Sequence, residues 1–248
     1  MSSSVGRARL YLLGRLAAVP SSHPLKRIAR ALRLNRWVPW ISNKYYSELG
    51  WQNRWAPVFQ ANVEKVRQYW REYRYFDEIL RIVQPGDDTR ILDVGCGIST
   101  VLHFLPGRRF GIDPLAEEYK RIYRYPSGIE VRRGFGEAIP FPDGYFDVVF
   151  CSNVLDHTTD PPRVVKEIDR VLRAAGYLVL TVEIFPSVRE RDLSHPHAFT
   201  REQVRALLDG SFETVFAKQS PWIMLLHYVD GSMKREGEQL VLVGRKKS

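Results

Sequence analysis

Two aspartates and two glycines near the middle of the chain have the types and spacing to bind a charged ligand. Asp93 follows an apolar run and precedes a glycine turn, in the order Asp93-Val94-Gly95-Cys96-Gly97. Glycines permit backbone conformations and a close ligand approach that side chains would block. A carboxylate there suits a ligand with an ammonium or sulfonium charge and would sit badly beside a pyrophosphate. Asp113, twenty residues after Asp93, is placed to accept hydrogen bonds from ribose hydroxyls.

Two other interpretations of these residues stay open. The turn could belong to an NAD(P)-binding oxidoreductase, whose fingerprint is GxGxxG. Thr100 stands where the third glycine would be, which argues against a dinucleotide. Asp113 could also cap the helix expected to start at Pro114, and this role is compatible with ribose binding.

Strands and helices alternate from Thr89 onward, and this pattern predicts the element that carries the turn. Alternation of this kind is typical of a mostly parallel sheet covered on both faces. We therefore expect an α/β, Rossmann-like, doubly wound sheet of seven strands, the last of them antiparallel. The expected strands are Arg90–Val94, Arg109–Asp113, Ile129–Arg133, Phe146–Cys151, Tyr177–Glu183, Phe212–Ala217 and Gln239–Gly244.

Start and stop signals place the helices between these strands. Asp160 precedes two prolines and predicts an N-cap, and the Thr200–Gln203 segment reads as a capping box for a helix that ends at Leu208. Shorter helices are expected over Ile98–Leu105 and from Pro114 to Arg124, and a loop or hairpin over 221–238.

Composition divides the chain into three predicted parts, at residues 1–42, 43–86 and 87–248. Residues 43–84 are rich in aromatic residues at helical spacing and predict one long helix or two shorter ones. Such a stripe belongs to a core or, alternatively, roofs a substrate pocket. Pro85-Gly86 marks the boundary to the last part.

The N-terminal part carries the whole excess of positive charge. Residues 1–47 hold nine cations and no acidic residue, while the other 28 basic residues balance the 28 acidic ones. Residues 25–36 predict an amphipathic helix with a basic face, followed by Trp37 and Trp40. The helix could pack on the domain, lie on a membrane surface through residues 1–41, or contact nucleic acid. The composition also suits an organelle transit peptide.

Two cysteines, Cys96 and Cys151, have no CxxC spacing, so neither a disulfide framework nor a metal site is expected. They read as small buried residues, which agrees with a reducing, cytoplasmic compartment. The chain has no uninterrupted apolar run long enough for a transmembrane helix.

Five segments in order resemble the successive motifs of class I S-adenosylmethionine-dependent methyltransferases, and most of all those of the methyltransferase type 11 group. These are the Asp93–Gly97 turn, Gly111-Ile112-Asp113, the segment from Gly134 to Val149, and the segments Asn153–His157 and Glu167–Gly176. The resemblance covers roughly residues 75–185. It implies S-adenosylmethionine as the cofactor.

The resemblance also implies a role for each matched position. Asp93, Gly95, Cys96 and Gly97 would hold the methionine part of the cofactor, and Asp113 its ribose. The segment Gly136-Glu137-Ala138 would edge the adenine, and Ser152 and Asn153 would lie near the sulfonium and the acceptor. The family's usual acidic residue after Gly134 is replaced by Phe135. Phe135 could stack on the adenine, or Glu137 could make the polar contact.

The catalytic base and the acceptor are harder to read. Among His157, Glu183, His195 and His197, which follow strands four and five, we favour His157 and His197. Neither an Asn/Asp-Pro-Pro-Tyr motif nor a Pro-Cys nucleophile is found, so a nucleic-acid acceptor is disfavoured. A small-molecule or lipid-like acceptor is expected, methylated on oxygen or carbon rather than nitrogen. A non-catalytic adaptor bound to membrane or RNA through residues 1–47 is a third hypothesis.

Overall fold

The computed structural model describes residues 43–186, 196–232 and 235–247. The chain divides into two compact units, residues 1–54 and 55–248. The described residues of the first unit, 43–54, are helical and belong to α3 (Asn43–Ala61). The amphipathic helix expected over residues 25–36 lies outside the described residues, and so does His195.

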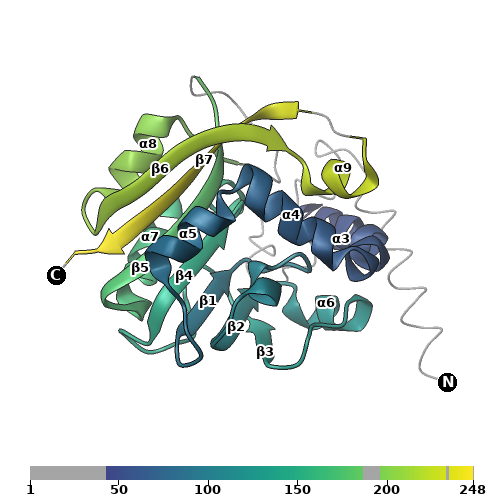
Figure 1. Ribbon diagram of the computed structural model, residues 1–248, viewed down its shortest axis with the longest axis horizontal. Helices are drawn as coiled ribbons and strands as arrows, with labels where there is room; N and C mark the ends of the chain where they lie inside the picture. Colours follow the sequence, from purple (N-terminus) through teal and green to yellow (C-terminus); the bar gives the residue numbers. More distant parts are fainter. Residues whose placement is uncertain (1–42, 187–195, 233–234, 248) are drawn as a thin grey trace, which may run out of the picture. The chain divides into compact units, whose positions relative to one another are not determined.

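One seven-stranded sheet forms the centre of the second unit (Figure 1). Its strand order is β3-β2-β1-β4-β5-β7-β6. The five strands from β3 to β5 pair in parallel, and β7 pairs antiparallel with both β5 and β6. This confirms the predicted fold class. The strands are β1 (Arg90–Val94), β2 (Arg108–Asp113), β3 (Ile129–Arg133), β4 (Phe146–Ser152), β5 (Leu172–Ile184), β6 (Phe212–Ile223) and β7 (Arg235–Lys246).

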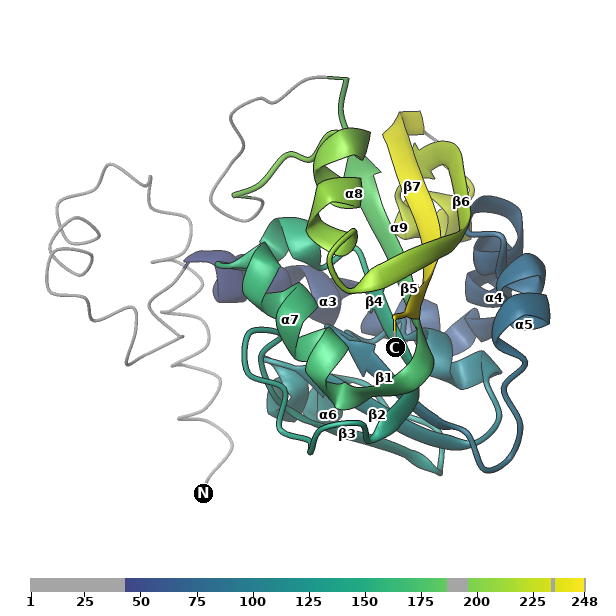
Figure 2. The same cartoon turned by 90° about the vertical axis from the view of Figure 1, so that its left-hand side faces the viewer.

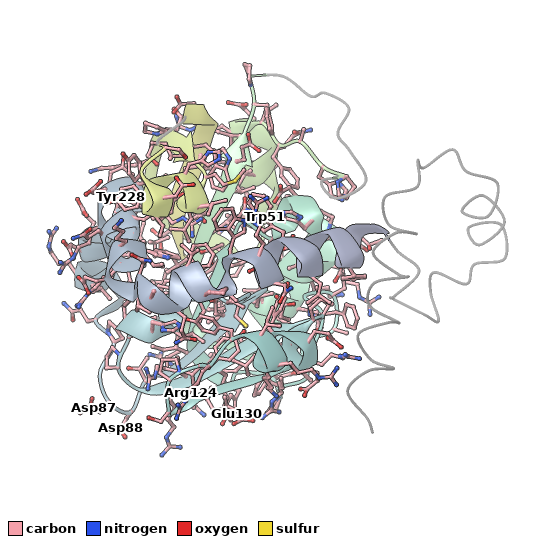
Figure 3. The ribbon with its side chains drawn as sticks, turned by 90° about the vertical axis from the view of Figure 1, so that its right-hand side faces the viewer. Trp51, Asp87, Asp88, Arg124, Glu130 and Tyr228 are labelled. Atoms are coloured by element: carbon pink, nitrogen blue, oxygen red, sulfur yellow. The ribbon has the colours of Figure 1, made fainter. Side chains whose placement is uncertain are left out.

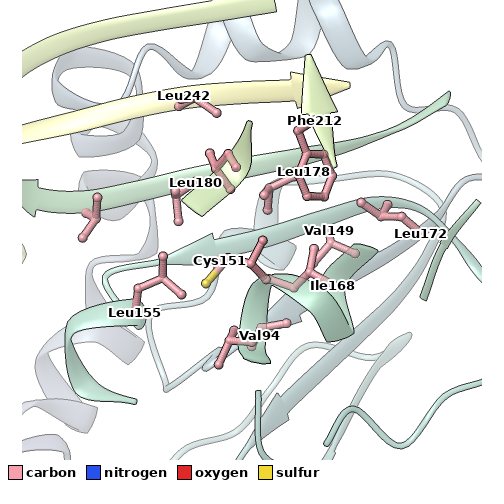
Figure 4. Close-up of a cluster of buried hydrophobic side chains, with 14 of the residues drawn as sticks. Val94, Val149, Cys151, Leu155, Ile168, Leu172, Leu178, Leu180, Phe212 and Leu242 are labelled. Carbon is pink, nitrogen blue, oxygen red and sulfur yellow. The ribbon is translucent and has the colours of Figure 1, made fainter. Parts of the chain in front are cut away.

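Helices cover both faces of this sheet, as Figure 2 shows. One face carries α7 (Pro161–Val171) and α8 (Arg201–Leu208), and the other carries α4 (Val63–Tyr73) and α5 (Phe76–Val83). Alternate strand residues point to opposite faces. Val149 and Cys151 of β4 thus belong to the core under α7 (Figure 4). Phe150 between them meets Trp70 of α4, with ring centroids 6.2 Å apart.

The predicted caps start α7 and α8 where expected. The Asp160 carboxylate accepts from the backbone N–H of Arg163 at 3.1 Å, and proline occupies the first turn of α7. Thr200 and Gln203 form both halves of a capping box at α8. Because each cap satisfies backbone donors that the helix leaves unpaired, local sequence suffices to set these starts.

Three helix predictions need correction. Residues 43–84 form three helices rather than one or two, because the helical path breaks at Asn62 and at Tyr75, whose φ is +53°. The expected helix over Ile98–Leu105 is only the 3-10 turn η3 (Val101–Phe104). The helix expected from Pro114 to Arg124 is the shorter α6 (Ala116–Ile122).

Of the loop and the hairpin expected over 221–238, the described residues form the hairpin, since Pro221 and Trp222 of β6 pair antiparallel with Glu238 and Gly237 of β7. β6 continues to Ile223, and α9 (Leu225–Asp230) follows it. Contacts with α4 hold this segment: Lys65 Nζ donates to the Val229 carbonyl at 2.9 Å, and the Tyr228 hydroxyl donates to Glu72 at 3.0 Å. Tyr228 is labelled in Figure 3. Tertiary packing, rather than local sequence, therefore forms α9.

Among the residues that the structure describes, no helix is both long and apolar enough to cross a bilayer.

Candidate active site

The parallel strands bring the predicted site residues to one edge of the sheet. Asp93 of β1 lies between Gly111 of β2 and Phe150 of β4 in the strand register, and Ser152 of β4 lies beside Thr181 of β5. Ligands of such sheets bind beyond the carboxyl ends of the strands, where the strand order reverses. The order reverses here between β1 and β4.

The glycine turn is held by backbone hydrogen bonds from both sides. Gly95 and Gly97 have φ of +68° and +51°, the left-handed region that favours glycine. The N–H groups of Gly95 and Cys96 both donate to the Ile112 carbonyl, at 2.8 and 3.1 Å. The Tyr125 hydroxyl donates to the Gly97 carbonyl at 2.6 Å. The turn is therefore preformed.

Asp113 braces the same turn from the end of β2. One carboxylate oxygen accepts from the Gly97 N–H at 3.2 Å, and the other accepts from the Leu115 N–H at 2.8 Å. The second bond is a local turn contact two residues along the chain. The predicted cap by Asp113 is not formed, because α6 begins after Leu115 and has no side-chain cap hydrogen bond. The first bond couples the predicted ribose ligand to the glycine turn.

Asp93 is a nearly inaccessible carboxyl group, 3% exposed. Burial raises the pKa of Asp93 to about 7, because desolvation disfavours the charged form. The Thr100 hydroxyl donates to this carboxylate at 2.6 Å, and the positive charge of Arg74 also favours its ionised form. Asp93 is thus poised to become fully charged when a cation reaches it.

Cys96 fills the space behind the turn. Its sulfur lies close to Gly111, where an added Cβ would come within 2.8 Å of it. Burial raises the pKa of the Cys96 thiol well above its usual value, and the same holds for Cys151. Both cysteines are buried and free, as the sequence predicted.

The segment predicted to edge the adenine forms a tight turn. Phe135 and Ala138 pair in an isolated antiparallel bridge across Gly136. The Glu137 carboxylate accepts from the Thr159 N–H at 2.8 Å. The Phe135 side chain is 37% exposed, so its ring is accessible for stacking on the adenine. The Glu137 carboxylate, the other candidate for an adenine contact, already has a partner within the chain.

Two neighbouring hydroxyl groups lie at the end of β4 and beside it in β5. The Ser152 and Thr181 hydroxyl oxygens are buried and have no hydrogen-bond partner among the described residues. Asn153 follows with φ of +58°, and its N–H donates to the Thr181 carbonyl at 2.8 Å. This left-handed residue turns the chain away from the sheet directly at the predicted acceptor side.

The two predicted catalytic histidines, His157 and His197, lie close together. His157 belongs to the segment 156–158, and His197 hydrogen-bonds to the backbone of that segment. His157 ends η4 (Leu155–His157), with its Nε2 3.8 Å from the buried Asp156 carboxylate. The backbone N–H of His197 donates to the Asp156 carbonyl at 3.4 Å. The His197 Nε2 lies 3.1 Å from the Thr158 carbonyl. A carbonyl only accepts, so Nε2 carries the proton and Nδ1 is the nitrogen with a free lone pair.

Arg74, which follows α4, is the residue that the sequence analysis missed. It is 7% exposed, with its guanidinium 4.6 Å from the Trp70 ring centroid. An arginine on an amphipathic helix normally reads as a solvated charge. The available signal was its position inside the aromatic run Tyr73-Arg74-Tyr75-Phe76.

Comparison with known proteins supports a specific chemistry for this site. A family model described as a methyltransferase domain matches residues 92–180, from the strand before the glycine turn to the middle of β5. The match contains Asp93, Asp113 and Ser152.

Curated relatives point to the same class of protein. An uncharacterized methyltransferase of Schizosaccharomyces pombe is 29% identical over 61% of this chain and 60% of its own length. The uncharacterized methyltransferase YcgJ of Bacillus subtilis is 25% identical over 70% of this chain and 78% of its own. The cycloartenol-C-24-methyltransferase 1 of Oryza sativa is 29% identical over 53% of this chain and 42% of its own.

A further relative, the ajmaline N-methyltransferase of Rauvolfia serpentina, is 27% identical over 62% of this chain and 57% of its own. Among solved structures, the YcgJ protein of Bacillus subtilis aligns with a TM-score of 0.54 at 18% identity, over 69% of this chain and 97% of its own. That likeness is one of fold.

Proposed function

We propose that this chain, a member of the class I S-adenosylmethionine-dependent methyltransferases, transfers the cofactor's methyl group to a small-molecule or lipid-like acceptor. The observation that carries the proposal is the preformed glycine turn between two carboxylates, Asp93 and Asp113. This donor set fits a cationic nucleoside better than a dinucleotide, because the Asp93 carboxylate at the glycine turn would repel a pyrophosphate. Asp113 at the ribose position fits either ligand.

When bound, S-adenosylmethionine supplies an electrophilic methyl group on a sulfonium. The residues around the cofactor would orient it and neutralise its charged groups. Asp93 would accept hydrogen bonds from the ammonium group, and Asp113, which holds the Gly97 N–H, would accept them from the ribose hydroxyls. Gly136-Glu137-Ala138 edges the adenine, with Phe135 available to stack on it. Ser152 and Asn153 would lie near the sulfonium and the acceptor.

A histidine serves as the base when the acceptor is a hydroxyl. With its Nε2 proton directed at the Thr158 carbonyl, His197 has Nδ1 available to take the acceptor's proton. His157 beside Asp156 is the other candidate. A positioned base contributes about 10²–10⁴-fold to the rate, and alignment of the two reactants contributes much of the rest.

Oxygen or carbon is the proposed acceptor atom, although the relatives include both a sterol C-methyltransferase and an N-methyltransferase. The absence of motifs for nucleic-acid methylation from the sequence supports a small acceptor. The basic and aromatic N-terminal part supports an apolar or membrane-presented acceptor, with peripheral membrane contact through residues 1–41 of a cytoplasmic protein.

Cofactor binding is the first test of this proposal. S-adenosylhomocysteine should raise the melting temperature of the wild-type protein in a saturable way, and Asp93→Ala should abolish that shift. NAD(H) should give no shift, which separates this function from the oxidoreductase alternative. A wild-type protein stabilised by neither S-adenosylmethionine nor S-adenosylhomocysteine would refute the proposal.

A further inference from the structure

Arg74, which caps the C-terminal end of α4, is a cation held inside the protein. It is 7% exposed, and its guanidinium lies over two rings, 4.6 Å from the centroid of Trp70 and 5.2 Å from that of Tyr69. Its Nε is buried without a hydrogen-bond partner. Within the described part of the chain, Arg74 makes no salt bridge with a carboxylate.

A buried guanidinium without a bound anion is unfavourable, because nothing in the protein fully replaces its lost hydration. The faces of Trp70 and Tyr69 offset part of this cost through their negative electrostatic potential. The Tyr69 side chain also hydrogen-bonds with Arg74. The guanidinium is still incompletely paired, because its Nε has no partner and aromatic rings do not occupy N–H donors as an oxygen anion does. The arrangement indicates a ligand that brings the anion.

The location of Arg74 specifies which ligand. Its charge acts on the Asp93 carboxyl group and favours the ionised form. Trp70, which lies under the guanidinium, contacts Phe150 of β4, and Phe150 is the register partner of Asp93. Arg74, which lies over Trp70, and Asp93 are therefore on the same face of the sheet.

We propose that Arg74 binds the carboxylate of the cofactor's methionine part while Asp93 binds its ammonium group. A zwitterionic amino acid presents both charges a few bonds apart, and the Arg74–Asp93 pair presents the two complementary charges. A guanidinium binds a carboxylate through two parallel hydrogen bonds, which also orients it. The inference rests on the proposed function. It adds the C-cap residue of α4, which lies outside the matched residues 92–180, to the cofactor site.

The test compares two ligands that share the nucleoside and the sulfur and differ only in the amino-acid group. S-adenosylhomocysteine carries the amino-acid group, and 5′-methylthioadenosine keeps the nucleoside and the sulfur but lacks it. We expect calorimetry on the full chain to show that Arg74→Met raises the Kd of S-adenosylhomocysteine at least tenfold. The Kd of 5′-methylthioadenosine should change less than twofold. Arg74→Lys, which keeps the charge but not the fork, should give an intermediate loss.

Arg71 provides the matched control. It lies on the same helix, but it is exposed and pairs with Asp77 at 3.2 Å, so Arg71→Met should leave both affinities unchanged. Thermal unfolding of each variant without ligand reports folding separately.

Five outcomes are informative. Selective loss of S-adenosylhomocysteine binding in Arg74→Met supports the inference. An equal loss for both ligands would assign Arg74 a purely structural role and overturn it. Unchanged affinities, or a wild-type protein that does not prefer S-adenosylhomocysteine over 5′-methylthioadenosine, would overturn it as well. A wild-type protein that binds neither ligand nor S-adenosylmethionine would refute the proposed function itself.

Discussion

Asp93 combines deep burial with a pKa near neutrality, and this makes cofactor binding depend on pH. Only the ionised carboxylate attracts an ammonium group, and burial raises the pKa of Asp93 to about 7 in the free protein. We therefore expect the affinity for S-adenosylhomocysteine to rise about tenfold between pH 6 and pH 8 and to level off above. Calorimetry across this range measures it. The Asp93→Asn variant should bind S-adenosylhomocysteine more weakly, and its affinity should not change across this pH range.

The same pKa affects the free energy of unfolding with the opposite trend. The usual pKa of an aspartate is 3.8, so between about pH 4 and pH 7 the folded state keeps a proton that the unfolded state has lost. The contribution of Asp93 to stability thus falls as pH rises through this window, by up to about 4 kcal/mol. Urea unfolding without ligand should show that the destabilisation of wild type relative to Asp93→Asn grows from pH 4 to pH 7. A difference independent of pH would contradict this.

Gly95 is a second residue of the glycine turn at which a substitution should be poorly tolerated. Its φ is +68°, and an added Cβ would collide with the side chain of Val154. We expect Gly95→Ala to lower the free energy of unfolding by about 1–3 kcal/mol and to weaken cofactor binding. Gly210→Ala is the control, because a Cβ there meets nothing within 4 Å. Equal stability of the two variants, measured by chemical denaturation, would rule out the predicted strain.

Sequence reasoning at this scale selects residues whose type has few uses in a given local setting. Asp93 and Asp113 were singled out because a carboxylate at a strand end beside glycines has a restricted set of uses. Arg74 was missed because its importance comes from Trp70, Tyr69 and the sheet below α4, and helical periodicity carries no information about a charge turned inward.

At the scale of the element, the capping box of α8 gives a direct test. Thr200→Ala removes the acceptor for the Gln203 N–H and should cost about 1 kcal/mol of stability. Thr200→Ser keeps the hydroxyl and should cost much less. Equilibrium unfolding measures both. Because His197 and Phe199 lie just before this helix, fraying of its first turn should also lower methyl transfer once an acceptor is known.

Elements with local start and stop signals were predicted well. The bounds of β3, Ile129–Arg133, and the start of α7 at Pro161 agree with the sequence. α9 was missed because its six residues are too few for a periodic pattern, and its position depends on hydrogen bonds with α4. The helix predicted over Ile98–Leu105 was too long. The Thr100 hydroxyl accepts a hydrogen bond from the Leu102 N–H and caps a single 3-10 turn.

At the scale of the whole molecule, the basic N-terminal part makes a prediction about surfaces. Residues 1–47 hold nine cations and no acidic residue, whereas the basic and acidic residues of the rest of the chain are equal in number. If residues 1–41 contact membranes, the full chain should bind vesicles with anionic lipid more tightly than neutral ones, and salt should weaken that binding.

Neutralising Lys26, Arg27, Arg30 and Arg33 to glutamine in the full chain should remove the preference for anionic vesicles, as flotation would measure. Thermal stabilisation by S-adenosylhomocysteine should be unchanged in this variant, which controls for folding. Binding of wild type to RNA but not to vesicles would instead favour the nucleic-acid alternative.

The position of β7 has a consequence for how the protein is made. β7 is the last strand in sequence, yet it lies between β5 and β6 in the sheet. During synthesis β6 emerges first and has no partner, while β5 exposes an unpaired edge open to association with other chains. The sheet closes only after residues 235–246 leave the ribosome. The nascent chain should therefore depend on chaperones until translation of this last strand is complete.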